Sequence, residues 1–97
     1  MDTKQLLIAR GIWEQTQEKL KKTHERINTG LYHEKKEVRE AASDALYNQI
    51  FLYERHRSLE PTREDIFDVT LRMALNLFLD VNKHAEDITL KIDAISV

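Results

Sequence analysis

The stretch IFDVTLRMALNLFLDV, residues 66–81, is apolar at nearly every position except every fourth one. Its polar residues form one narrow stripe along a helix: Asp68, Arg72, Asn76 and Asp80. The apolar residues cover more of the circumference than one neighbouring helix can bury. We therefore expect this helix to lie in the middle of a bundle or to complete its burial against another chain.

Length and composition favour a small helical protein. The chain has 97 residues, so we expect a single domain over 1–97 that buries one core. Two glycines, one proline and 33% charged residues indicate few turns and long helices. The predicted fold is all-α, an antiparallel bundle of three to four helices with the third helix, about 63–81, at its centre. No cysteine is present, which excludes disulfides and thiolate chemistry.

The first predicted helix runs to about Asn28, and its apolar seam is narrow. Large apolar residues recur every seven positions, with smaller residues between them: Leu6, Trp13, Leu20 and Ile27, and Ala9, Thr16 and Thr23. The seam should therefore be partly polar. Gly30 is expected to end this helix, because glycine readily adopts the left-handed conformation of a helix C-terminus.

A second helix is predicted over about His33 to Arg57, and Pro61 separates it from the third. Thr62, with Asp65 three residues later, is a typical helix start. The last segment is ambiguous. Ile88, Leu90 and Ile92 alternate with polar residues as in a strand, but they also fit a helical face. Since no other segment offers a partner strand, we predict a fourth helix over about Lys83 to Ile95.

Several classes of function find little support in the sequence. The basic cluster around Lys21 and Lys22 is interleaved with Glu18 and Glu25, so nucleic acid is not an expected partner. Residues 66–81 are too short and too charged to span a bilayer, and no leader is recognisable, so we expect a cytoplasmic protein without a membrane partner. His33 and Glu37 form only an isolated pair, and no catalytic motif is apparent. We expect no metal, no cofactor and no enzymatic activity.

A binding surface is predicted on the second helix, opposite its core face. Tyr47 and Phe51 lie one turn apart, with Ile50 beside them, and acidic residues surround this trio: Glu40, Asp44 and Glu54. Aromatic side chains provide large contact areas, and an acidic border favours encounter with a basic partner. The alternative is that Tyr47 and Phe51 pack against a neighbouring helix of the same bundle.

The second half of the chain resembles a known family in a set of spaced residues: Leu46, Gln49, Ile50, Tyr53, Thr62, Arg63, Ile66, Thr70, Leu71, Ala74, Asp80, Ala85, Ile88 and Ile92. The pattern is similar to that of helical immunity proteins that protect bacteria from type VI secretion NAD(P)-glycohydrolase toxins. The family's usual Asp-Pro start to its last helix is replaced here by His84 and Ala85. The resemblance implies an all-α protein that binds a cognate toxin in the cytoplasm and blocks its NAD-cleaving site.

The sequence therefore favours a non-catalytic protein-binding module, in its most concrete form an immunity-type inhibitor of a toxin. The alternative is a self-associating structural or regulatory bundle, in which the broad apolar helix over 63–81 closes a homodimer. A small helical enzyme is the third and least favoured interpretation.

Overall fold

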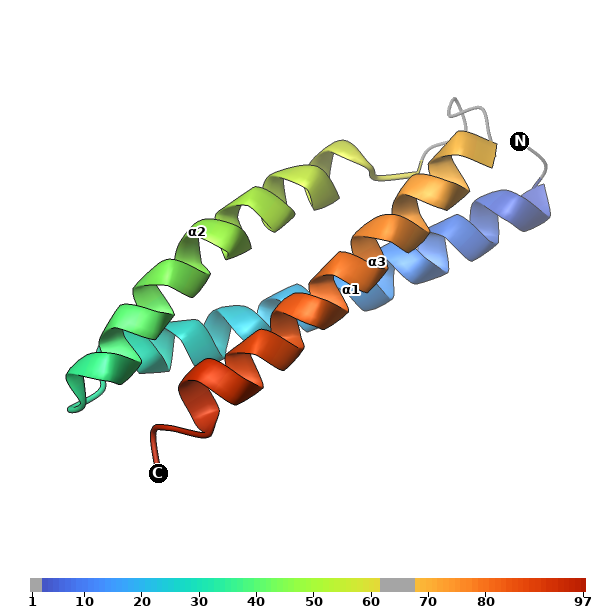
Figure 1. The fold of residues 1–97 in the computed structure, drawn as a ribbon. Coiled ribbons are helices and arrows are strands. Elements are labelled where there is room, and N and C mark those ends of the chain that lie inside the picture. Colours follow the sequence, from blue (N-terminus) through green and yellow to red (C-terminus); the bar gives the residue numbers. More distant parts are fainter. Residues whose placement is uncertain (1–2, 62–67) are drawn as a thin grey trace.

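The protein is an elongated bundle of three helices. The computed structural model describes residues 3–61 and 68–97, and every regular element in these ranges is helical. The helices are α1 (Thr3–Leu31), α2 (Lys36–Ser58) and α3 (Asp68–Ile88), and a π-helical turn, η1 (Thr89–Asp93), continues α3. α2 runs antiparallel to α1 and α3 (Figure 1). The predicted all-α antiparallel bundle is confirmed, with three helices as the number.

The central position belongs to α1 rather than to the third helix. α1 contacts both other helices extensively, whereas α2 and α3 contact each other less. Two neighbours leave one side of α3 uncovered, so Met73, Leu75 and Leu79 keep 43%, 43% and 62% of their surface exposed. The described part of this apolar stretch therefore exposes one face to solvent, and the helix is not enclosed on all sides as the sequence suggested.

The seam predicted on α1 is the seam that the structure uses. Its buried residues are Ala9, Thr16, Leu20, Thr23, Ile27 and Gly30. They contribute to two hydrophobic clusters at successive levels of the bundle. One cluster contains Ile27, Val38, Ala42, Ile88 and Ile92, and the other contains Leu20, Leu52, Leu77 and Val81. Since only one narrow face of each helix enters these clusters, the opposite faces remain on the surface.

Gly30 lies inside α1 and does not end it, contrary to the sequence-based expectation. A Cβ atom at this position would lie 2.9 Å from the Cβ of Ala42 and 3.2 Å from Cγ2 of Ile92. The missing side chain therefore lets α1 approach α2 and η1 closely, which is a packing role rather than a conformational one. α1 continues to Leu31, and α2 begins at Lys36 rather than near His33.

The fourth helix predicted over about Lys83 to Ile95 is wrong as a separate element. α3 passes through Asn82 without a break, because no glycine or proline interrupts it and its buried stripe continues through His84 to Ile88. The segment is helical rather than a strand. η1 then adds one wider turn, in which the N–H of Ala94 donates to the carbonyl oxygen of Thr89 at 2.9 Å. The helix start predicted at Thr62 lies outside the described residues.

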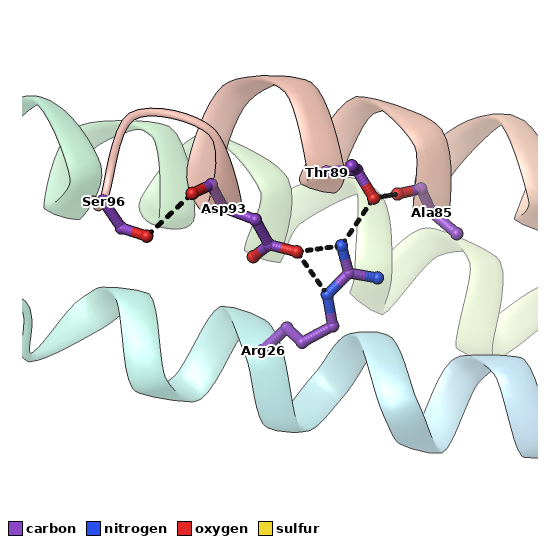
Figure 2. A network of polar contacts seen from close by, with 5 residues as sticks. All are labelled: Arg26, Ala85, Thr89, Asp93 and Ser96. Carbon is purple, nitrogen blue, oxygen red and sulfur yellow. Dashed lines mark hydrogen bonds and ion pairs between the residues drawn. The ribbon is translucent and has the colours of Figure 1, made fainter.

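Arg26, in the second half of α1, connects this helix to the wider turn (Figure 2). Its Nη2 donates to Oγ1 of Thr89 at 2.7 Å, and its Nε donates to Oδ2 of Asp93 at 3.0 Å. Nη2 makes a further short contact with the same carboxylate oxygen. Because Thr89 and Asp93 bracket η1, one guanidinium from α1 fixes both ends of the π-helical turn.

The loop between α1 and α2 holds the residues that follow η1. Lys35 Nζ donates to the carbonyl oxygens of Ile95 and Val97 at 3.1 and 2.7 Å. His33 Nε2 lies 3.2 Å from the carbonyl oxygen of Ser96 and donates to it. These contacts attach residues 95–97 to the loop that precedes the first residue of α2.

Replacing Gly30 by alanine tests the close approach of α1, α2 and η1. The new Cβ would overlap with Ala42, whose own Cβ cannot rotate away, so the helices must separate. Alanine has a higher helix propensity than glycine, which offsets part of this steric cost. We therefore expect a net loss of about 1–2 kcal/mol of unfolding free energy for the G30A variant in urea titrations. The matched control is Gly11→Ala, because a Cβ at Gly11 meets nothing within 4 Å and should stabilise α1. Equal stability of the two variants would contradict this role of Gly30.

Candidate protein-binding surface

The outer face of α2 presents three large apolar side chains to solvent. Tyr47 is 76% exposed, Ile50 54% and Phe51 59%. The opposite face of α2 carries its buried residues: Val38, Ala42, Gln49, Leu52 and His56. The alternative in which Tyr47 and Phe51 pack within the bundle is therefore not what the structure shows. We call this face, with Glu40, Asp44, Tyr47, Ile50, Phe51 and Glu54, the α2 surface.

The carboxylates of the α2 surface are all exposed. Glu54 pairs with Arg57 Nη2 at 2.6 Å, and Glu40 lies 3.7 Å from Lys36 Nζ. Asp44 forms no ion pair with any residue in 3–61 or 68–97. Exposed pairs within one helix contribute at most about 0.5 kcal/mol each, so these carboxylates can exchange their partners at little cost. The negative charge of the α2 surface is accordingly available to a binding partner.

The ring of Phe51 contacts Arg55, which is bound in turn to α3. The guanidinium carbon of Arg55 lies 5.8 Å from the centroid of the Phe51 ring. Arg55 is itself held by Asp80 of α3, through a hydrogen bond of 2.7 Å from Nη1 to Oδ2. This arrangement restricts the ring of Phe51 before any partner binds, which lowers the entropy that binding would cost.

A groove of about 520 Å³ adjoins the α2 surface, between α2 and the end of α3 with η1. Most of its walls are apolar: Ala41, Ala45, Ile88, Leu90, Ile92 and Ile95. Asp44 and Asp87 also line it, and Asp44 belongs to the α2 surface as well. The groove exists because α2 and α3 contact each other less than either contacts α1. Sequence reasoning did not identify it, since it depends on the distance between two helices.

A buried layer of polar side chains lies between the two hydrophobic clusters. The Gln49 amide donates from Nε2 to the carbonyl oxygen of Leu20 at 2.8 Å. Its Oε1 accepts from His84 Nε2 at 2.8 Å and lies 2.9 Å from the hydroxyl of Thr23. All three helices thus meet at one amide group. Each of these bonds requires a particular alignment of the helices, so the layer fixes their register.

The hydrogen bonds of His84 favour its uncharged form. Nε2 donates to Oε1 of Gln49 at 2.8 Å, and Nδ1 lies 3.0 Å from Nδ2 of Asn48, an arrangement that suits a neutral ring. Burial lowers the pKa of His84 below its ordinary value of 6.5, against the attraction of Asp87, and the nearby Arg26 lowers it further. A proton on Nδ1 would also break the bond from Asn48. The layer is therefore built for the uncharged imidazole.

A second histidine joins α1 to the end of α2. The ring of His56 stacks on Trp13 with 4.1 Å between centroids and 13° between planes. Trp13 Nε1 donates to the carbonyl oxygen of His56 at 2.7 Å, and His56 Nε2 donates to that of Trp13 at 2.9 Å. Burial lowers the pKa of His56, although the bond to Trp13 and the nearby Glu60 oppose this. His56 therefore belongs to the core, with only 3% of its surface exposed.

Residues 3–61 and 68–97 contain no group of three His, Asp or Glu side chains that could hold a metal ion. The isolated pair of His33 and Glu37 does not form a site, because both ring nitrogens of His33 are engaged. Nδ1 accepts from the N–H of Lys35 at 3.0 Å, and Nε2 contacts Ser96. Within the same ranges, no helix has the length and apolar character needed to cross a bilayer.

The lowered pKa values of His56 and His84 predict that the unfolding free energy depends on pH. Because their pKa values in the folded protein lie below 6.5, the unfolded chain binds protons more readily than the folded chain in mildly acidic solution. The unfolding free energy should have its full value above pH 6.5 and fall as the pH decreases toward the lowered pKa values. Urea titrations between pH 7.5 and 5.5 measure this slope. A His84→Gln variant should show a shallower slope, whereas a flat profile for the unmodified protein would contradict the prediction.

The α2 surface and its groove are thus defined by geometry and charge. The residues predicted for partner binding lie together on one exposed face, and Asp44 links them to the groove between α2 and α3. Comparisons with protein-family models, curated proteins and solved structures found no match for this chain.

Proposed function

We propose that this protein is a non-catalytic binding module that docks onto another protein through the α2 surface. The observation that carries this proposal is the exposure of Tyr47 and Phe51, at 76% and 59%, on the face of α2 that the bundle does not use. A folded monomer gains nothing from two exposed aromatic rings one turn apart, whereas a partner that covers them gains a large apolar contact.

The structure of the α2 surface suits rapid and specific binding. Its aromatic side chains project from a regular helix of 23 residues, so their spacing is set before the partner arrives. The carboxylates around them would attract a basic region and orient it, which raises the association rate more than the affinity. The partner is accordingly expected to present basic side chains around an apolar patch.

In its most specific form, the proposal is an immunity-type inhibitor that acts in the cytoplasm. The resemblance of residues 46–92 to immunity proteins of NAD(P)-glycohydrolase toxins supports this version. An inhibitor of this kind needs no catalytic group of its own. It binds beside or over the NAD-cleaving site of the toxin and excludes the substrate.

Truncation of the aromatic pair tests the binding proposal. We expect a Tyr47→Ala/Phe51→Ala variant to keep its unfolding free energy within about 0.5 kcal/mol, because both rings are exposed. Its affinity for the partner should fall by about 30-fold or more. The measurement is capture from native lysate on immobilised protein, followed by titration with the captured protein. Tyr32→Ala is the matched control, since Tyr32 is 84% exposed outside α2.

Equal capture by the unmodified protein, the double variant and the Tyr32→Ala control would contradict the proposal. Charge reversal at Glu40, Asp44 and Glu54 should slow association while the thermal unfolding curve stays nearly unchanged. For the more specific version, one equivalent of this protein should abolish NAD cleavage by the captured partner. A partner without such activity would exclude the toxin inhibitor and leave the binding module.

A further inference from the structure

The α2 surface contains a regular order of residue types along its helix. Asp44, Tyr47, Phe51 and Glu54 follow one another at spacings of three, four and three residues, which places them on one face. All four side chains are exposed. The face thus reads acidic, aromatic, aromatic, acidic over about 15 Å of helix.

The uncovered face of α3 contains the complementary order. Arg72, Leu75, Leu79 and Lys83 follow at spacings of three, four and four residues, and all four are exposed. Neither Arg72 nor Lys83 forms an ion pair with an acidic side chain in residues 3–61 or 71–97. This face, which we call the α3 surface, reads basic, aliphatic, aliphatic, basic over nearly the same length of helix.

We propose that the α3 surface of one molecule docks onto the α2 surface of a second copy. Leucines of one chain would cover the aromatic rings of the other, and a cation would meet a carboxylate at each end of the contact. Glu54 pairs with Arg57 of its own helix, and both side chains are exposed. Replacing this pair by one between Glu54 and a cation of the second copy therefore costs little. This inference goes beyond the proposed function and holds whether or not a foreign partner exists.

The α2 surface and the α3 surface of one chain lie at different levels along the bundle axis. Within one chain, Arg55 of α2 lies opposite Asp80 of α3, and Asn48 lies opposite His84. Tyr47 and Phe51 therefore lie about 10 Å along the bundle axis from the level of Leu75 and Leu79. A two-fold axis parallel to the helices preserves these levels and would not align the two surfaces. The two surfaces align when one copy shifts along the bundle axis, which continues head to tail, or when a two-fold axis perpendicular to the bundle reverses one copy, which closes a dimer.

The contact is expected to be weak and sensitive to salt. One helix face against another buries less area than stable interfaces do, and its charged ends lie at the solvent-exposed rim. A foreign partner on the α2 surface would displace the second copy. Self-association would then hold the aromatic pair covered until that partner arrives.

Charge exchange tests the proposal, with the weight-average mass measured by sedimentation equilibrium between 10 µM and 1 mM at low salt. The mass of the unmodified protein should rise well above that of the monomer at high concentration and return to the monomer value in 0.5 M salt. Asp44→Lys/Glu54→Lys and Arg72→Glu/Lys83→Glu should each remain monomeric. The variant with all four changes keeps the net charge of −2 and should associate like the unmodified protein. Lys21→Glu/Lys22→Glu is the control, and its association should persist.

Monomeric unmodified protein at 1 mM would overturn the proposal, as would a monomeric fourfold variant with a normal circular dichroism spectrum. Leu75→Ala/Leu79→Ala separates this inference from the proposed function, because it should lose self-association and keep the capture of a foreign partner. If the unmodified protein captures no partner from lysate, the proposed function fails, but the sedimentation measurements of self-association still test the present inference.

Discussion

The side-chain amide of Gln49 is the point on which the arrangement of the three helices depends. It contacts the carbonyl oxygen of Leu20 on α1, the hydroxyl of Thr23 and the imidazole of His84 on α3. A shift of any helix by one residue would leave a buried polar group without its partner, which costs about 1–3 kcal/mol. The apolar clusters above and below this layer supply cohesion, but they tolerate sliding more readily than directional bonds do.

This constraint also determines which residues remain outside. Once Gln49 points toward α1 and α3, Tyr47 and Phe51 must lie on the opposite side of α2, because helix periodicity leaves no other orientation. The same argument applies to α3, where His84 faces the layer and Leu79 faces away. The exposed α2 and α3 surfaces are therefore consequences of the buried layer. A mutation that weakens the layer would alter both surfaces together.

Much of the fold could be predicted from local patterns. The recurrence of Leu6, Trp13, Leu20 and Ile27 at every seventh position correctly located the seam of α1. The low glycine and proline content correctly indicated long helices. The exposed aromatic pair on α2 also followed from the periodicity of the buried residues around it. These features depend on the order of residues within one helix, which the sequence contains directly.

Other features depend on distances between helices, and the sequence did not reveal them. Gly30 looked like a helix end, yet its role arises from Ala42 and Ile92 across the bundle. His56 lies near the end of α2, and its contact with Trp13, 43 residues earlier, shows that it belongs to the core. Which helix is central, and the groove beside Asp44, likewise follow from the unequal separation of the helices.

The dimensions of the bundle have a practical consequence for its hydrodynamic behaviour. The Cα atoms span 50 × 18 × 15 Å, and their radius of gyration is 15.4 Å, against about 12.5 Å for a spherical domain of this length. Such a rod diffuses more slowly than a sphere of equal mass. A single copy will therefore leave a gel-filtration column at the volume of a larger globular standard. Apparent size from elution alone would overstate the number of chains.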